Sequence, residues 1–186
     1  MSTEQKLANA GPLGLMGFGM TTVLLNLHNA GFFPETTAIV FAMGICFGGL
    51  AQIIAGILEF TRGNTFGTVA FTSYGCFWQS LVAIWILPAL KLADKPDGAF
   101  MGWYLLLWGI FTLFMFIGAL KGSKVLQFVF LSLTVLFVLL ALHNFLESRL
   151  IGVIAGYVGI VCGLSAMYLA MAEVLHEQHH KSILPF

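Results

Sequence analysis

Residues 9–29 read NAGPLGLMGFGMTTVLLNLHN, an apolar stretch that begins at a Gly-Pro step and carries polar side chains in its second half. Proline is tolerated best in the first turn of a helix, so Pro12 marks a helix start. At helical spacing one face of this helix carries Thr22, Asn26 and Asn29, with Thr21 on its flank. The stretch therefore predicts a membrane helix that lines a path for a small solute.

The composition of the chain excludes a water-soluble domain. Of 186 residues, 59% are hydrophobic and only 9% are charged, which leaves too little polar surface for a soluble protein of this size. A membrane span needs roughly 20 mostly apolar residues, and six such segments follow one another between short polar breaks such as Pro34-Glu35. We predict an all-α membrane protein with spans at residues 13–33, 36–60, 66–90, 99–120, 125–145 and 150–175.

The breaks divide the chain into a segment 1–12 with the helix start, a transmembrane domain 13–175 and a tail 176–186. An even number of spans places both ends on one side of the membrane. That side carries five basic residues (Lys6, Arg62, Lys121, Lys124 and Lys181) and the other side three (Lys91, Lys95 and Arg149). This bias predicts cytoplasmic termini. The glycine pairs Gly44/Gly48, Gly152/Gly156 and Gly159/Gly163 predict close helix contacts.

The net charge limits the kinds of partner that we expect, and the isolated cysteines favour a packing role. The net charge of zero gives no reason to expect nucleic acid, and the bilayer is the extended partner implied. The three cysteines, Cys46, Cys76 and Cys162, stand alone in apolar segments, and we interpret them as small buried residues. No convincing internal repeat is detected.

Ionisable residues are scarce inside the predicted spans. Only Glu59 and Glu173 fall within them, both near helix ends. Charged groups at the membrane midplane are costly and commonly mark ion or proton pathways. We therefore expect a polar but uncharged path, without buried charge, for a small and weakly charged solute rather than a metal ion or a phosphorylated metabolite.

The polar span residues are the candidates for solute contact. Hydroxyl and amide groups of Thr21, Thr22, Asn26, Asn29 and Asn144 can replace part of a solute's water shell, although such residues also bond neighbouring helices. Tyr74 offers a ring with a polar tip, for gating or for packing. His143 is interpreted as an interfacial residue rather than a proton carrier.

Two further motifs have two interpretations each. The Gly11-Pro12 start either aims backbone N–H groups at an anion or is an ordinary helix start at the membrane surface. The His176-x-x-His179-His180 spacing matches membrane di-iron oxygenases, in which imidazoles bind metal. Those enzymes resemble one another in using several histidine clusters, whereas His28 and His143 stand alone here. We therefore expect a solvated tail and no metal or other cofactor.

The stretch NAGPLGL at residues 9–15 resembles the NPAPLGL signature of the acetate uptake transporter family, and GLMGFGMTTVLLNLHN is similar to bacterial members of that family. The likeness extends over the whole chain. It includes GNTFG at 63–67, AFTSYG at 70–75, LWGIFTLFMF at 107–116, VLQFVF at 125–130, SLTVLF at 132–137 and YLAMAEVL at 168–175. The chain departs from the signature at Ala10 and Gly11, where the family has proline and alanine, and retains Pro12.

The resemblance implies a transporter rather than an enzyme. It implies an inner-membrane protomer of six helices in a homo-oligomer, a hexamer, with a separate path for acetate in each protomer and succinate as a further substrate. The family likeness places an apolar constriction at Phe18, Tyr74 and Leu133. It also implies that Asn9, Gly11, Pro12, Leu13, Gly14 and Leu15 form the family's signature at the start of the first helix.

These expectations favour transport of small carboxylates through a narrow apolar neck, by a proton-linked permease or an anion channel. A urea or short-amide channel is the first alternative, because it also suits an uncharged path. A membrane-embedded metal enzyme or a structural subunit is the second.

Overall fold

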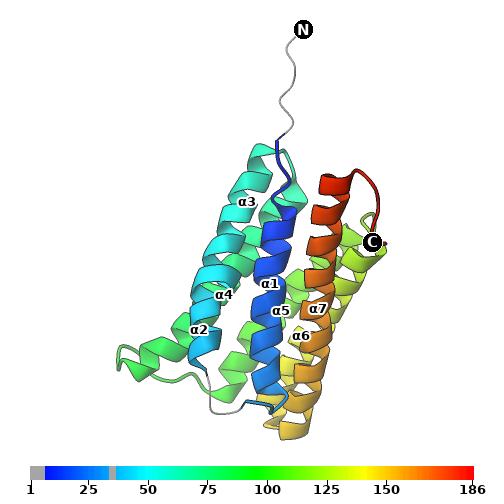
Figure 1. Ribbon diagram of the computed structural model, residues 1–186. Helices are drawn as coiled ribbons and strands as arrows, with labels where there is room; N and C mark the ends of the chain where they lie inside the picture. The colour runs from blue at the N-terminus through cyan, green and yellow to red at the C-terminus, as the bar shows by residue number, and fades with distance from the viewer. Residues whose placement is uncertain (1–6, 34–36) are drawn as a thin grey trace.

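The computed structural model describes residues 7–33 and 37–186, and within these ranges all regular structure is helical (Figure 1). The elements are α1 Gly11–Asn29, α2 Ala38–Ile45, η1 Cys46–Ala51, α3 Gln52–Thr61, α4 Thr65–Ala89, α5 Gly98–Ala119, α6 Lys124–Leu146 and α7 Arg149–His179. The single π-helical turn η1 joins α2 and α3 into one rod, Ala38–Thr61.

Five helical segments are long and apolar enough to cross a membrane: Ala38–Thr61, α4, α5, α6 and α7. The chain is therefore a multi-pass membrane protein. The 19-residue α1 is not among the five, since its proline, threonine, asparagine and histidine residues make it less apolar. It nevertheless runs the length of the bundle beside α7 (Figure 1).

The helices alternate in direction, so the start of α1 and the end of α7 lie at the same end of the bundle (Figure 1). Side chains cap three helix starts: Asn64 accepts from the Gly67 N–H, Asp97 from the Phe100 N–H and Ser123 from the Leu126 N–H. Each cap satisfies a backbone donor that has no partner within its helix. These polar turns are the breaks that the sequence indicated.

Most predicted bounds differ from the observed ones by a residue or two, with two exceptions. The first helix ends at Asn29 rather than at residue 33, because the chain turns at Gly31, whose φ is +90°. The last helix continues to His179, a turn beyond the predicted residue 175, and ends at His180 in a left-handed conformation. Lys6 and the break at Pro34-Glu35 lie outside the described residues.

Glycines set the close approach of α1 to its neighbours. A Cβ on Gly163 of α7 would lie 2.7 Å from the Gly19 carbonyl oxygen of α1, and a Cβ on Gly48 of η1 would lie 2.8 Å from Thr21. A Cβ on Gly156 would similarly meet the Ala30 backbone. The predicted close contacts are confirmed, and these lie within one protomer.

The cysteine prediction is wrong for two of the three positions. Cys162 is fully buried in the bundle, whereas Cys46 and Cys76 are exposed on the outside of the protomer. Both lie on helix faces that turn away from the core. In a membrane protein such a face meets apolar surroundings, which a small apolar side chain tolerates.

Candidate functional site

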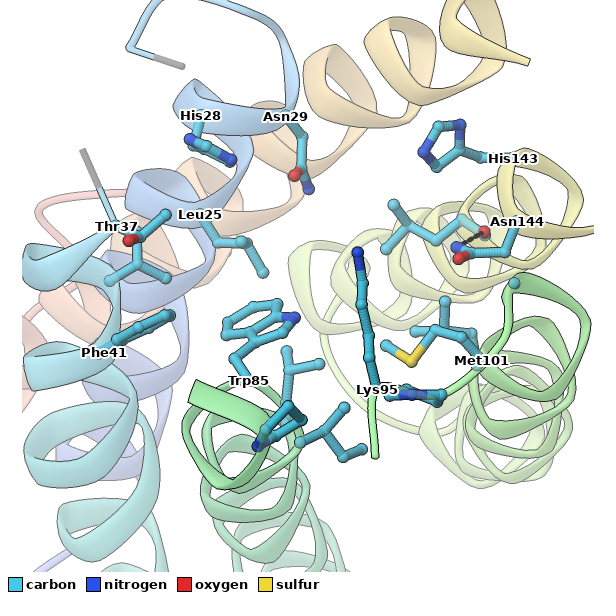
Figure 2. Close-up of a pocket in the computed structure, with 18 of the residues that line it drawn as sticks. Leu25, His28, Asn29, Thr37, Phe41, Trp85, Lys95, Met101, His143 and Asn144 are labelled. Carbon is cyan, nitrogen blue, oxygen red and sulfur yellow. Dashed lines mark hydrogen bonds between the residues drawn. The ribbon is translucent and has the colours of Figure 1, made fainter. Parts of the chain in front are cut away.

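Two cavities open at opposite ends of the bundle. The larger, about 790 Å³, lies away from the start of α1, and we call it the distal vestibule. Its wall is mostly apolar, with Trp85 and Phe41 prominent (Figure 2). Its polar side chains are those of His28 and Asn29 at the end of α1, Thr37 before α2, Lys95 and Asp97 before α5, and His143 and Asn144 near the end of α6.

The second cavity, about 470 Å³, lies at the end where α1 begins and α7 ends, and we call it the terminal vestibule. Its polar lining is Asn9, Glu59, Arg62, Asn64, Glu173, His176 and Glu177. Asn9 belongs to the segment before α1, Glu59 and Arg62 to the end of α3, and Glu173 to α7.

One buried apolar cluster contributes residues to both cavities. Phe77, Leu81 and Leu105 belong to the cluster and line the distal vestibule. Leu15, Ala70 and Phe130 belong to the same cluster and line the terminal vestibule. The cluster therefore forms part of the wall of both cavities.

The three predicted constriction residues lie inside the cluster and line neither cavity. Phe18 is 7% exposed, and Tyr74 and Leu133 are 3% exposed. The ring centroids of Phe18 and Tyr74 are 6.0 Å apart, a distance typical of packed aromatic pairs. The Tyr74 hydroxyl donates to Thr112 Oγ1 at 2.9 Å, and Thr112 in turn donates to the Trp108 carbonyl. The ring is thereby held by α5.

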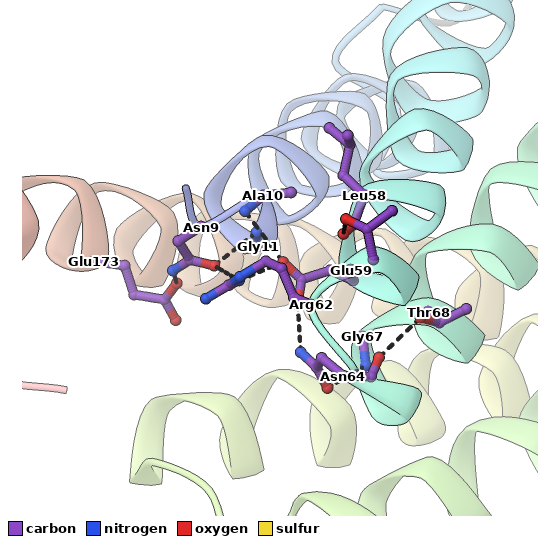
Figure 3. Close-up of polar contacts among 11 residues, drawn as sticks. Asn9, Ala10, Gly11, Leu58, Glu59, Arg62, Asn64, Gly67, Thr68 and Glu173 are labelled. Atoms are coloured by element: carbon purple, nitrogen blue, oxygen red, sulfur yellow. Dashed lines mark hydrogen bonds and ion pairs between the residues drawn. The ribbon is translucent and has the colours of Figure 1, made fainter. Parts of the chain in front are cut away.

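The terminal vestibule contains a buried charge, contrary to the expectation of a charge-free bundle. Glu59 is 1% exposed, and its carboxylate accepts bonds from the Arg62 guanidinium at 2.6 Å, the Ala10 N–H at 3.1 Å and the Asn64 amide (Figure 3). A buried charge needs both an opposite charge and hydrogen bonds. Glu59 has both, which explains how it is accommodated.

Asn9 joins this network to α7. Its amide nitrogen donates to Glu173 Oε2 at 3.0 Å, and its oxygen accepts from Arg62 at 2.7 Å and from the Gly11 N–H at 3.0 Å. Figure 3 shows Asn9 between Glu173 on one side and Arg62 on the other. One side chain before α1 thus links the ends of α3 and α7.

The N–H groups at the start of α1 are occupied. Ala10 donates to Glu59, Gly11 donates to Asn9, and Leu13 and Gly14 both donate to the Ala10 carbonyl. Proline at position 12 has no N–H. The geometry is that of a helix start whose anion is supplied by the chain itself, the Glu59 carboxylate.

The remaining signature residues serve packing and lining. Gly14 lies against the Phe71 ring, and Pro12 is buried. Leu15 lines the terminal vestibule, as do Asn9 and Gly11, whereas Leu13 is 38% exposed on the outer side.

The five predicted polar contacts divide into two groups. Asn29 and Asn144 line the distal vestibule. Thr21, Thr22 and Asn26 are at most 2% exposed and line neither described cavity. Thr21 donates to the Gly17 carbonyl and Asn26 to the Thr22 carbonyl, and Asn26 packs on Gly159 of α7.

Two buried oxygens in this region have no hydrogen-bond partner among the described residues: Thr22 Oγ1 and Gln52 Oε1. Gln52 is fully buried at the start of α3, and its amide nitrogen donates to the Gly48 carbonyl. Sequence reasoning did not select Gln52, although it is a polar residue within an apolar span, the signal that selected Asn26.

Sequence reasoning also did not select the basic groups of the distal vestibule, His28, Lys95 and His143, as solute contacts. A signal was present in the sequence. Residues 23–29 read VLLNLHN and residues 138–144 read VLLALHN, so a short internal repeat exists, contrary to our expectation. Both copies end beside the same cavity.

In the described part of the chain, no three His, Cys, Asp or Glu side chains are grouped so as to hold a metal ion. The first histidine of the His176-x-x-His179-His180 spacing packs edge-on against Phe186, with ring centroids 5.9 Å apart.

Comparison with known proteins places this arrangement in a family. The profile of the GPR1/FUN34/yaaH family matches residues 1–185. The chain belongs to this family. The family membership that the signature at residues 9–15 indicated is thereby confirmed.

Two curated relatives have names that refer to transport. The chain is 62% identical to the succinate-acetate/proton symporter SatP of Escherichia coli K12, over 97% of this chain and 95% of that protein. It is 36% identical to the ammonia transport outward protein 2 of Saccharomyces cerevisiae, over 94% of this chain and 64% of the longer yeast protein.

A solved structure has the same fold. The structure described as the bacterial acetate channel SatP superimposes with a TM-score of 0.95 at 61% sequence identity, covering 97% of this chain and 99% of that one. The membrane-protein fold class is thereby confirmed. The two names for SatP differ in mechanism, one being a proton symporter and the other a channel.

Proposed function

We propose that this chain is a permease that passes acetate and related small carboxylates, including succinate, across the bacterial inner membrane. The path runs within each protomer, from the distal vestibule through the neck at Phe18, Tyr74 and Leu133 to the terminal vestibule. The supporting observation is that one apolar cluster containing all three neck residues forms part of the wall of both cavities. The names of the SatP relatives supply the substrate class.

The neck selects by size and by the cost of removing water. A carboxylate that enters an apolar constriction loses hydrogen bonds that the side chains there do not replace. The barrier is lowest for a short acid, and lower still for an acid that is briefly neutral. Polar groups on the distal side of the neck, those of Thr22, Asn26 and Asn29 on α1 and Asn144 on α6, shorten the distance over which the solute is without partners.

The same proposal covers topology and assembly. Six helices cross the membrane, α1 among them, with both termini in the cytoplasm, and the protomers form a hexamer. The terminal vestibule then faces the cytoplasm and the distal vestibule faces the periplasm. The protein needs no cofactor and catalyses no covalent step, in keeping with the transporter and channel names of its relatives.

A neutral small-solute channel is the second candidate function, and the yeast relative named for ammonia transport favours it. Competition distinguishes the two. Acetate uptake that succinate inhibits and urea or ammonium leaves unchanged supports the carboxylate path, whereas the reverse pattern contradicts it. A metal enzyme or structural subunit is excluded if the purified protein holds no metal and transport survives joint substitution of His176, His179 and His180.

Uptake of labelled acetate by proteoliposomes tests the proposal, with Leu133→Ala as the key variant. Shortening this side chain widens the neck, so bulkier acids such as lactate should enter at a rate that approaches that of acetate. Leu131→Ala is the matched control, because Leu131 lies on the same helix but is 46% exposed on its outer face. An unchanged substrate range in Leu133→Ala would contradict the neck.

Counterflow and pH-jump uptake in the same liposomes decide between the two mechanisms. A proton-linked permease accumulates acetate when the pH is lowered outside, against the gradient of acetate itself. An anion channel responds to membrane potential instead.

A further inference from the structure

The distal vestibule is bounded by two copies of one sequence. VLLNLHN at residues 23–29 and VLLALHN at residues 138–144 differ only at Asn26 and Ala141. Phe18 precedes His28 by ten residues, and Leu133 precedes His143 by ten residues. Each of these two helices, α1 and α6, therefore supplies one neck residue and, about three turns later, one histidine.

Equivalent residues of the two copies have equivalent positions. Leu25 and Leu140, His28 and His143, and Asn29 and Asn144 form three pairs, and all six side chains line the same cavity. Figure 2 shows His28 and Asn29 on one side of it and His143 and Asn144 on the other. The two helices run in the same direction (Figure 1), and residues near the C-terminal end of each line the vestibule.

The two histidines also make the same bond. His28 Nδ1 lies 2.9 Å from the Phe33 carbonyl oxygen, and His143 Nδ1 lies 2.8 Å from the Ser148 carbonyl oxygen, in each case five residues further on. A carbonyl oxygen only accepts, so Nδ1 carries the proton in both rings. The second nitrogen, Nε2, is then the one that gains or loses a proton.

Lys95 adds a fixed positive charge between the two copies. It belongs to the linker between α4 and α5, and its side chain extends into the cavity between the two histidine-asparagine pairs (Figure 2). An ammonium group offers three donors and attracts a carboxylate without fixing its orientation.

We propose that the paired LHN segments form a two-sided carboxylate-binding site in the distal vestibule, one imidazole Nε2 and one asparagine amide on each side, with Lys95 between them. A dicarboxylate such as succinate places one carboxylate on each side, and a monocarboxylate occupies either. This inference rests on the proposed function and adds to it the residues that bind and concentrate the substrate before the neck. It revises the interpretation of His143 as an interfacial residue only.

Binding at such a site includes a proton. On each side of the site, the imidazole Nε2 and one oxygen of the bound carboxylate share one proton, which lies either on nitrogen, as imidazolium with carboxylate, or on oxygen, as imidazole with carboxylic acid. Only N–H and O–H bonds change between the two forms. A histidine that starts neutral therefore takes up one proton from solution when a carboxylate binds.

The surrounding charges are few. Lys95 and Asp97 line the same cavity, and Asp97 accepts the Phe100 N–H at the start of α5. Glu147 in the turn before α7 and Arg149 at the start of α7 do not line the cavity, while α7 presents Gly152 to the His143 ring. Glu35 follows His28 in a segment outside the described residues.

Two substitutions at each histidine distinguish a role in carboxylate binding from a structural role at the end of the helix. Asparagine places its amide nitrogen near the position of Nδ1, so His28→Asn and His143→Asn retain the bond to the carbonyl and lose Nε2. Glutamine places its amide near the position of Nε2, so His28→Gln and His143→Gln retain a donor for the carboxylate but hold no proton for it.

Binding to the purified full-length protein is measured by calorimetry at about pH 7.5. Each single Asn variant should weaken succinate binding about tenfold and acetate binding no more than about threefold, since one side remains for acetate. The double Asn variant should weaken both about tenfold or more. Titrations in buffers of different ionisation heat should show proton uptake in the wild type and none in the double Gln variant.

Matched controls come from outside the cavity. Lys91→Gln removes the same charge from the same linker as Lys95→Gln, and His179→Gln removes an exposed imidazole at the opposite end of α7. Both controls should leave succinate binding unchanged, whereas Lys95→Gln should weaken it severalfold.

Three results would overturn the site. One is equal loss of acetate and succinate binding in each single Asn variant; another is normal binding in all Asn variants. The third is damage from Gln with no damage from Asn, which marks a structural role at the helix ends. If wild-type liposomes transport no carboxylate at all, the proposed function fails instead, so the two failures are distinguishable.

Discussion

The two vestibules of this bundle hold their charged groups in opposite ways. In the distal vestibule the basic side chains reach into the cavity, with Lys95 on an exposed linker and two histidines that each use one ring nitrogen to bond the backbone. In the terminal vestibule the acidic and basic groups bond one another. Glu59, Arg62 and Asn9 form a closed network that also binds the first N–H groups of α1.

The difference separates two uses of polar residues in a membrane. Polar groups that already have partners hold helices together, and their loss costs stability. Polar groups that still have a free donor or acceptor beside a cavity bind solutes, and their loss costs affinity. We therefore expect substitutions in the terminal vestibule to lower stability and those in the distal vestibule to lower binding.

The largest expected effect is that of Glu59→Ala. This change leaves the Ala10 N–H and the Asn64 amide without an acceptor and Arg62 without its anion. The loss of these charge-assisted bonds, with the buried Ala10 N–H left unsatisfied, costs about 3 kcal/mol in total, whereas Arg62, whose side chain is 28% exposed, can then be solvated by water. The thermal unfolding midpoint in detergent should fall by several degrees, and the yield of folded protein should fall with it.

Glu177→Ala is the control for Glu59→Ala. Glu177 also lines the terminal vestibule but is exposed, so its loss should change the midpoint little. Equal effects of the two substitutions would mean that the closed network contributes nothing particular to the fold.

Most of the fold could be predicted from the sequence. Apolar length and short polar breaks give the helices at residues 65–89, 98–119 and 124–146 to within a residue or so, because the breaks contain the residues Asn64, Asp97 and Ser123 that cap the start of the next helix. The end of α1 was missed because residues 30–33 are as apolar as a helix, and only the positive φ of Gly31 shows the turn.

The site was less predictable, for physical reasons that differ from residue to residue. Asn29 and Asn26 lie on one helix face, but only Asn29 reaches a cavity, because Gly159 of α7 lets Asn26 pack into the helix contact. Helical spacing does not indicate which neighbour approaches. The pairing of His28 with His143 was readable from the VLLxLHN repeat, yet their common cavity depends on tertiary packing.

A matched pair of asparagines sharpens the contrast between the two vestibules. Asn9→Ala removes bonds to Gly11, Arg62 and Glu173, and should cost about 1–3 kcal/mol of stability. Asn144→Ala removes one side-chain bond to the Leu140 carbonyl. That carbonyl still accepts its backbone hydrogen bond within the helix, so stability should be nearly unchanged. The unfolding midpoint should fall for Asn9→Ala alone.

Transport should show the converse for Asn144→Ala. We expect a higher half-saturation concentration for acetate at unchanged stability, measured in proteoliposomes. A fall in stability with unchanged half-saturation would place Asn144 among the structural residues and remove the contrast between the two cavities.

Between the two cavities, Tyr74→Phe tests whether the neck depends on its one hydroxyl. The substitution removes the bond to Thr112, and Thr112 keeps its bond to the Trp108 carbonyl, so no buried donor is left without an acceptor. The cost should be about 0.5–1.5 kcal/mol. The ring itself is retained, with its packing against Phe18, so the width of the neck and the exclusion of lactate should not change.

If acetate uptake falls about tenfold while the unfolding midpoint stays constant, the hydroxyl contacts the passing solute and the neck is not purely apolar. Thr112→Val separates the alternatives, because it frees the Tyr74 hydroxyl without removing it: a purely structural bond makes both variants alike, whereas a solute contact leaves Thr112→Val active and Tyr74→Phe impaired.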